Sequence, residues 1–391
     1  MSDRRAHAVR SVLSRLPASA STVRLLLWAL IVVLLLAAPL SLTSFWLQTA
    51  LFVMAAAIGA IGLTVLVGAT GQLSLAHAFF VAIGAYGYAF LAGASERDVL
   101  GAGLAPPLAA VGAVALSALA GALFSPIAGR LRGIYLGLAS LGLVFLGQHV
   151  MQNAAAVTGG FNGRDAEPFR IFSFSFTGTD PDLIVLDVPY GALERLWYLG
   201  LLLLGLAYWY ARNVLRGRPG RALMAVRDSE VAAAVMGVDV RRYKAAAFTL
   251  SSAYAGLAGV LLALAFGRIV PESFGFLMSI DFLAMIIIGG MGSVGGAVAG
   301  ALVVTALPLI LSRYSDVLPF LAQPGEAGVG AAEAARLLYG AAVIAVLLFA
   351  PGGLAQLARR PIDKEHSHDS TSMGSDGGLM PGADRMQQGR T

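Results

Sequence analysis

The sequence predicts an all-α, polytopic transmembrane helical protein with about ten spans. Of its 391 residues, 58% are hydrophobic and only 13% are charged, whereas charged residues make up about 25% of ordinary soluble domains. Apolar runs of the roughly 20 residues that cross a bilayer recur along the chain. Most of the arginines lie in the segments between these runs.

Composition also limits the chemistry of the chain. Cysteine is absent, which excludes disulfides, thiolate metal sites and a cysteine nucleophile. The net charge of +5 would suit nucleic acid, but the positive-inside rule of membrane proteins explains arginines beside apolar runs better. We therefore expect membrane lipid around the chain, no nucleic-acid partner, no cofactor and no metal.

The N-terminal residues 1–24 are polar and carry five arginines. A signal peptide is the alternative, because an apolar run at 25–43 follows this basic start. However, no small-residue cleavage site is clear and many more spans follow. We expect residues 1–24 to be a cytoplasmic segment and residues 25–354 to form the transmembrane domain.

The second predicted span, about 46–67, ends in a polar, glycine-containing break at Gly68–His77, and the third span follows at 78–94. Non-helical backbone at membrane depth is tolerated only where protein or a water-filled cavity surrounds it. Gln72, Ser74 and His77 are therefore candidates for the translocation pathway. The alternative is that they only satisfy the local backbone and pack within the bundle.

A fourth span ends near residue 128, and the later spans are expected at about 134–153, 196–210, 245–266, 280–288, 297–311 and 337–349. The loop after the fifth span contains the run Thr158–Gly163 and a β-like alternation of phenylalanines at 172, 174 and 176. Between the eighth and ninth spans, the run Gly289–Gly296 favours close helix packing and a tight turn over a binding loop. Residues 355–391 are polar, which is typical of a disordered tail.

Charge asymmetry predicts the orientation. With ten spans and both termini in the cytoplasm, most lysines and arginines fall on the cytoplasmic side, as the positive-inside rule requires. Only the following arginines fall outside: Arg97, Arg164, Arg170, Arg195, Arg268, Arg313 and Arg336.

The predicted spans are nearly free of charge. His77 and His149 are the candidates for titration inside them, and Asp281 and Arg336 lie at span ends. Ion-coupled transporters usually place ionisable residues at membrane depth. The chain also lacks the GxxxxGK[ST] phosphate loop of ATPases. Uphill transport would therefore need an ATPase on another chain.

The charged segment Arg216–Lys244 lies between two spans. Asp228 or Ser229 can cap a short helix with Glu230 in its first turn, and Gly237 can end it. The small residues Ala232, Ala233 and Ala234 lie between them. Helical spacing places Glu230, Ala233 and Gly237 on one face. The pattern predicts a helix held in a groove of another protein.

Five blocks in order resemble the LivM-type permeases of bacterial high-affinity branched-chain amino-acid ABC importers. They lie at Gly68–Tyr86, Thr158–Gly163, Gly220–Gly259, Pro271–Gly300 and 338–354. The resemblance implies a permease subunit in the bacterial inner membrane, serving branched-chain amino acids or a related small solute. It implies as partners a second LivH-type permease subunit, two ABC ATPase subunits and an extracytoplasmic solute-binding protein.

The resemblance also implies roles for single residues. It assigns ATPase coupling to Asp228, Glu230, Ala232, Ala233 and Gly237, although Val231 occupies the position of the acid in the broader importer pattern Glu-Ala-Ala-x-x-x-Gly. The outward loop suits docking of the binding protein through Gly159, Gly160, Asn162 and Gly163, with a simple turn cluster as the alternative. The loop at 312–335 and the tail look longer than in the family.

A secondary transporter or channel working alone is the alternative function. The charge-poor spans and the coupling segment argue against it. A membrane enzyme lacks support because the sequence contains no HExxH motif, no aspartate pair within the spans and no serine with a plausible base.

Overall fold

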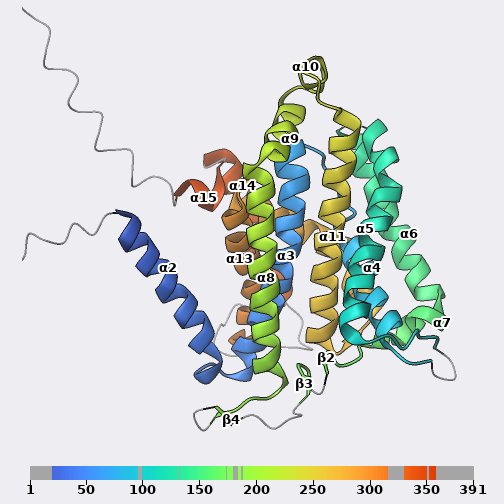
Figure 1. Cartoon of the computed structure of the whole chain (residues 1–391), viewed down its shortest axis with the longest axis vertical. Coiled ribbons are helices and arrows are strands. Elements are labelled where there is room, and N and C mark those ends of the chain that lie inside the picture. The colour runs from blue at the N-terminus through green and yellow to red at the C-terminus, as the bar shows by residue number, and fades with distance from the viewer. Residues whose placement is uncertain are drawn as a thin grey trace, which may run out of the picture.

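Helices form most of the computed structural model, which describes residues 20–95, 99–131, 133–172, 174–178, 184–185, 188–315, 330–349 and 352–357. The predicted N-terminal segment up to residue 19, the tail from residue 358 and most of the 312–335 loop lie outside the described residues. The helices run roughly side by side as a bundle (Figure 1). The predicted all-α class is confirmed.

The chain passes through its helices in the following order: α2 (Ala20–Ala37), η1 (Ala38–Leu40), α3 (Ser44–Leu63), the π-helical η2 (Thr64–Gly68), α4 (His77–Ala92), α5 (Pro106–Arg130), α6 (Ile134–Asn153), α7 (Ala155–Thr158), η3 (Gly160–Asn162), α8 (Ala192–Arg216), α9 (Arg218–Asp228), α10 (Glu230–Val235), α11 (Val240–Phe266), η4 (Pro271–Phe274), α12 (Phe276–Gly289), α13 (Val294–Arg313), α14 (Ala331–Phe349) and α15 (Gly353–Leu357).

Each predicted span coincides with one of these helices, but the helices differ in length. Among the described residues, six segments are long and apolar enough to cross a membrane: Ser44–Gly68, Pro106–Arg130, Ile134–Asn153, Val240–Phe266, Val294–Arg313 and Ala332–Phe349. Shorter apolar helices lie at Ala29–Leu40, His77–Ala92 and Phe276–Gly289. The chain is therefore a polytopic membrane protein, and the count of ten spans stays a prediction.

Short antiparallel strand pairs lie at the end of the bundle opposite α10 (Figure 1). The β-like phenylalanine alternation contributes to one of them, in which Ile171 pairs with Phe174. The described pairs are β1 (Arg164–Asp165) with β6 (Arg268–Ile269), β2 (Arg170–Ile171) with β3 (Phe174–Ser175), and β4 (Ile184–Val185) with β5 (Val188–Pro189).

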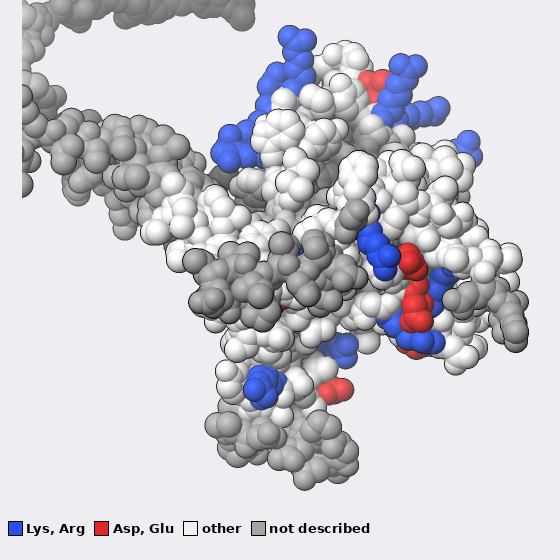
Figure 2. Space-filling view, turned by 60° about the horizontal axis from the view of Figure 1, so that its bottom comes forward, with Lys and Arg blue, Asp and Glu red and all other residues white. Residues whose placement is uncertain are grey.

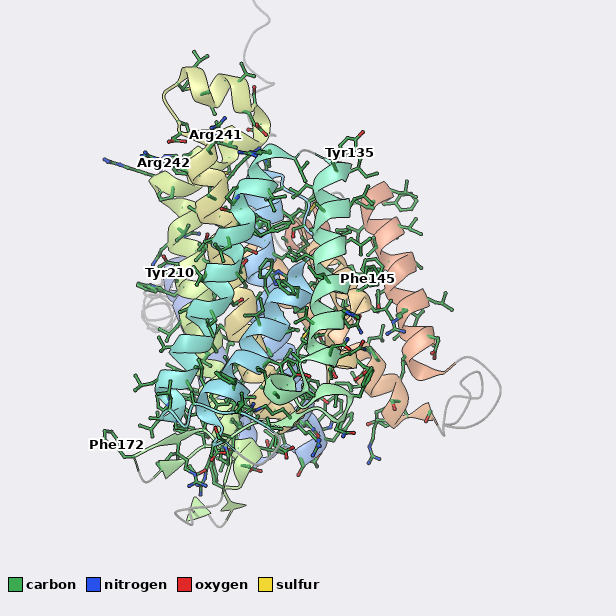
Figure 3. All side chains as sticks on the ribbon, turned by 90° about the vertical axis from the view of Figure 1, so that its right-hand side faces the viewer. Tyr135, Phe145, Phe172, Tyr210, Arg241 and Arg242 are labelled. Atoms are coloured by element: carbon green, nitrogen blue, oxygen red, sulfur yellow. The ribbon has the colours of Figure 1, made fainter. Side chains whose placement is uncertain are left out.

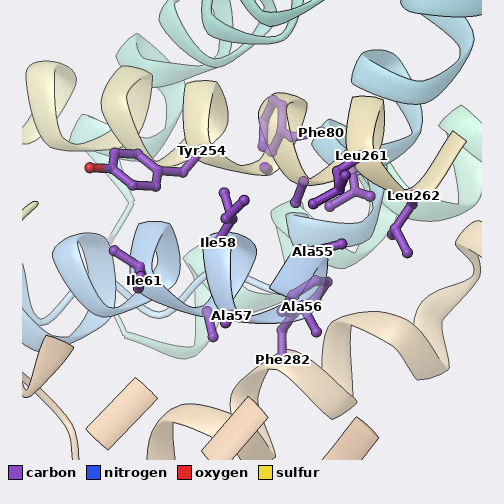
Figure 4. Close-up of a cluster of buried hydrophobic side chains, with 14 of the residues drawn as sticks. Ala55, Ala56, Ala57, Ile58, Ile61, Phe80, Tyr254, Leu261, Leu262 and Phe282 are labelled. Atoms are coloured by element: carbon purple, nitrogen blue, oxygen red, sulfur yellow. The ribbon is translucent and has the colours of Figure 1, made fainter. Parts of the chain in front are cut away.

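Helices α3 and α11 form the centre of the bundle. Both are apolar around most of their circumference and largely buried, as expected for helices enclosed by others. Ile58 of α3 points toward α11, and Phe282 of α12 lies on the other side of α3 (Figure 4). Helices α5, α6 and α14 bury much less of their surface, which leaves one side of each for lipid or another protein.

Glycines allow the central helices to approach closely. A Cβ atom at Gly84 of α4 would lie 2.2 Å from the carbonyl oxygen of Gly256 in α11. One at Gly259 would lie 2.0 Å from the oxygen of Val81. Small residues at such crossings let helix backbones touch, and van der Waals packing holds membrane helices together.

The run Gly289–Gly296 also allows two helices, α12 and α13, to pack closely. A Cβ atom at Gly289 would lie 2.0 Å from the oxygen of Gly296, and one at Gly300 would lie 1.8 Å from the oxygen of Met285. Gly290 and Gly292 have positive φ angles in the turn between α12 and α13. This confirms the predicted tight turn between two packed helices.

We expect Gly84→Ala to lower the free energy of unfolding in detergent by about 1–3 kcal/mol, the usual effect of overpacking. The added methyl group would meet the Gly256 backbone, which cannot move aside as a flexible side chain could. Gly205→Ala in α8 is the matched control, because nothing lies within 4 Å of its Cβ position. Thermal unfolding of both variants checks the prediction, and equal stabilities would contradict it.

Candidate functional site

The charged segment predicted from the sequence forms α9 and α10 at one end of the bundle (Figure 1). Pro219 lies in the first turn of α9, where its missing N–H costs nothing. Helix α9 buries Gly220, Leu223 and Val226, so it is fixed to the bundle. Beyond it, α10 projects farthest from the membrane helices (Figure 1).

Helix α10 has the predicted ends. The Ser229 hydroxyl accepts a hydrogen bond from the Ala232 amide at 3.2 Å, so Ser229 rather than Asp228 is the N-cap. Gly237 has a φ angle of 84°. The Gly237 and Val238 amides donate to the carbonyls of Ala234 and Ala233, both at 3.0 Å, which is the Schellman pattern.

The structure buries part of the face of α10 that the sequence predicts to contact a partner. Ala233 is only 1% exposed, because α10 packs this side against its own chain. The Glu230 carboxylate accepts a hydrogen bond from Lys244 Nζ at 2.5 Å, and Lys244 is itself buried. Asp228 is exposed but pairs with the neighbouring Arg227 at 3.2 Å. Of the predicted residues, Asp228, Ala232 and Gly237 are exposed, and Glu230 is partly exposed.

The open face of α10 is apolar. Val231, Val235 and Met236 are 74%, 85% and 82% exposed. These residues form an exposed apolar surface on a small helix within an otherwise charged segment.

The last turn of α9 connects this segment to the non-helical break between α3 and α4. Arg227 Nη1 donates a hydrogen bond to the carbonyl oxygen of Gly68 at 2.9 Å. Gly68 also touches the turn between α12 and α13, because a Cβ atom there would lie 2.6 Å from the Gly292 nitrogen. Three segments that are distant in sequence therefore meet at the end of α3.

The predicted non-helical break is confirmed. Helix α3 passes into the π-helical η2, and residues 71–76 have no helical structure before α4 begins at His77. His77 lies beside the middle of α3, since a Cβ atom at Gly59 would be 3.4 Å from His77 Nε2. The chain therefore folds back into the bundle before α4 starts.

Hydroxyl groups satisfy the exposed backbone of this break. The Leu75 amide donates to Ser140 Oγ of α6 at 2.8 Å. The Ala78 amide donates to Ser279 Oγ of α12 at 3.1 Å, and the Ala76 amide donates to Ser74 Oγ at 3.3 Å. Ser74 thus satisfies the local backbone, which is the alternative given above for this residue.

Gln72, Ser74 and His77 are all buried, so they do not line an open passage in this conformation. Both side-chain amide atoms of Gln72, and Nε2 of His77, have no hydrogen-bond partner among the described residues. The His77 ring instead packs edge to face on Phe282, with ring centroids 4.7 Å apart. The break therefore holds buried polar groups without a hydrogen-bond partner among the described residues.

The Thr158–Gly163 loop is a rigid turn at the opposite end of the molecule, where acidic and basic side chains lie near one another (Figure 2). Gly159, Gly160 and Gly163 all have positive φ angles, and a Cβ atom at Gly163 would lie 2.2 Å from the Ile269 oxygen. Arg268 Nε donates to the Asn162 carbonyl at 3.1 Å. The glycines thus shape the turn, and Phe161 and Asn162 form its exposed surface.

Asp281 lies deeper than the span end predicted from the sequence. It is in the second turn of α12 and accepts a hydrogen bond from the Tyr339 hydroxyl of α14. It lines an apolar pocket of about 290 Å³ together with Phe52, Phe266 and Thr305. The part of the chain that the structure describes contains no group of three or more His, Asp or Glu side chains that could hold a metal ion.

Comparison with known proteins identifies the family. Residues 45–347 match the family described as branched-chain amino acid transport system / permease component. The chain belongs to this family. It is a multi-pass permease of the bacterial inner membrane.

Curated relatives agree with the LivM-type resemblance. The chain is 33% identical over 309 residues to the high-affinity branched-chain amino acid transport system permease protein LivM of Escherichia coli (strain K12), covering 76% of this chain and 67% of that protein. It is 26% identical to LivH of Salmonella typhimurium, covering 67% and 84% of the two chains. The xylose transport system permease protein XylH of Escherichia coli is 34% identical over 28% of each chain. No solved structure matches the chain significantly.

Proposed function

We propose that this permease is one membrane subunit of an ATP-driven importer for branched-chain amino acids or a related small solute. The observation that carries the proposal is the open apolar face of α10. This face lies outside the membrane helices, and the chain belongs to a permease family. The substrate class follows the names of its LivM and LivH relatives. ATP hydrolysis then belongs to two separate ATPase subunits.

The α10 face has the character of a protein-binding surface. Val231 and Val235 lie one helical turn apart, and Met236 lies beside them. An amphipathic helix laid into a groove is a common recognition mode, and its buried apolar anchors dominate the binding energy. Ala233 and the Glu230–Lys244 pair support α10 from behind. We therefore assign ATPase contact to Val231, Ala232, Val235 and Met236 and a supporting role to Glu230 and Ala233.

A displacement of α10 can be transmitted through α9 to the membrane helices. Helix α9 is fixed at its end by the Arg227–Gly68 hydrogen bond, and Gly68 begins the break that leads to α4. Ser279 then connects the start of α4 to α12. We propose that ATP-driven displacement of α10 rearranges this break, so that the helices alternate between outward and inward openings. The rearrangement would expose Gln72 and His77 to the passage.

The remaining assignments follow from this arrangement. We propose ten spans with both termini in the cytoplasm, a permease domain over residues 25–354, a coupling segment at 216–244, and polar cytoplasmic segments at 1–24 and 355–391. A second LivH-type permease would complete the passage. An extracytoplasmic binding protein would deliver solute near Phe161 and Asn162, which lie at the end of the bundle opposite α10.

We expect Val235→Asp to weaken ATPase binding by at least about tenfold, equal to roughly 1.4 kcal/mol, and to abolish solute-stimulated ATP hydrolysis and uptake. The buried carboxylate would be unpaired in the partner's groove. Stability of the isolated permease should not change, because Val235 is exposed. Binding, hydrolysis and uptake in reconstituted vesicles measure the effect.

The matched control is Tyr135→Asp, which introduces the same charge at an exposed position of α6 away from α10 (Figure 3). It should bind the ATPase as the parent does. Normal binding and uptake by Val235→Asp would remove the support for α10 as the coupling helix. Uptake that stops when ion gradients collapse while ATP remains available would favour a secondary transporter.

Arg227→Gln should leave ATPase binding intact and reduce the solute transported per ATP hydrolysed. The neutral amide is shorter and cannot keep the Gly68 hydrogen bond, so movement of α9 would no longer reach the break. Arg221→Gln, an exposed position on the same helix, is the control. An unchanged ratio of uptake to hydrolysis in Arg227→Gln would contradict the proposed route.

Single cysteines test the orientation, and the chain contains no native cysteine to interfere. Glu167→Cys and Met236→Cys lie at exposed positions at opposite ends of the bundle. A membrane-impermeant maleimide should label Glu167→Cys from outside whole cells and Met236→Cys only in inside-out vesicles. Labelling of both from one side would refute the ten-span arrangement.

A further inference from the structure

A groove of about 840 Å³ lies beside α10. Its walls are the last turns of α5, the first turns of α11 and the side of α10 that carries Val231 and Val235. Apolar surface comes from Pro126 and Val240, and basic side chains come from Arg130, Arg241 and Lys244. Arg241 and Arg242 lie at the end of the bundle that carries α10 (Figure 3).

The groove carries excess positive charge. Lys244 is neutralised by Glu230, and Arg242 pairs with Asp239 at 3.0 Å. Arg130 and Arg241 are exposed and form no ion pair with any residue of the described ranges. Among the described residues of the lining, Glu230 is the only acidic one, so the two remaining arginines favour an anionic ligand.

The groove lies at the level of lipid headgroups. Helix α11 has 27 residues and α5 has 25, lengths of about 40 Å against a hydrocarbon core of about 30 Å. Arg130 ends α5, and Arg241 lies in the first turn of α11, so both are near the membrane boundary. Basic pockets between membrane helices on the cytoplasmic side bind anionic headgroups.

An apolar stripe on α5 leads to the same groove. Leu116, Leu119, Leu123 and Ile127 are exposed and recur at helical spacing. The stripe ends at Pro126 and Arg130 on the groove wall. A ligand that fits both features has a negative headgroup and a long apolar chain.

We propose that this groove binds the phosphate of an anionic phospholipid, with Arg130 and Arg241 at the headgroup and an acyl chain along the α5 stripe. The groove shares Val231 and Val235 with the proposed ATPase contact. Because α10 forms one wall, a bound lipid would hold the coupling helix in position. Its effect on transport rests on the proposed function of α10.

The test measures binding of phosphatidylglycerol and phosphatidylcholine to the assembled transporter in mild detergent by native mass spectrometry. The parent should retain phosphatidylglycerol preferentially, and an excess of inorganic phosphate should not displace it. The double variant Arg130→Gln, Arg241→Gln should bind phosphatidylglycerol about tenfold or more weakly. The control Arg218→Gln, Arg221→Gln removes the same charge from exposed positions of α9 outside the groove and should bind as the parent does.

Equal binding of the two lipids by the parent would overturn the proposal, as would undiminished phosphatidylglycerol binding by the groove variant. Displacement by inorganic phosphate would show an anion site without a lipid chain and would also overturn it. Loss of the lipid from the permease when the ATPase subunits join would show that the ATPase fills the groove, and it would also overturn the proposal. Lipid binding is measured without transport. The binding result can therefore be interpreted even if the importer proposal fails.

Discussion

Close contact between helix backbones is the constraint on which the rest of the structure depends. Lipid is as apolar as leucine, so burial of side chains alone does not hold membrane helices together. Gly84 and Gly256 remove the side chains that would separate α4 from α11, and Gly289 and Gly296 do the same for α12 and α13. These contacts fix α11 and α12 around α3, and thereby fix where the short helix α4 can begin.

The position of α4 explains the polar residues around it. A helix that begins inside the bundle leaves amides that water cannot reach, and each must find a partner within the protein. Ser140 and Ser279 supply oxygens from two different helices. The same hydrogen bonds make the break a junction of α3, α4, α6 and α12, and Arg227 adds the cytoplasmic segment to it.

The sequence predicts well what local chemistry decides. Apolar runs identified the helices, glycine and polar residues identified both breaks, and Ser229 and Gly237 bounded α10. The open face of α10 could not be predicted, because a six-residue helix has too little periodicity. Lys244 reaches Glu230 across 14 residues, and Arg227 reaches Gly68 across 159, so neither pairing has a local signal. Asp281 was placed at a span end because the partner on α14 could not be known.

The unpartnered polar atoms of Gln72 and His77 have an energetic consequence for gating. A buried donor or acceptor without a partner costs about 1–3 kcal/mol, so the closed arrangement of this break is less stable than its packing alone would make it. Water entering an opened passage would satisfy these atoms and recover that free energy. In the proposed alternation between outward and inward openings, the break would thereby narrow the free-energy gap between the closed and open states, so that a modest force from the cytoplasmic side would shift the population between them.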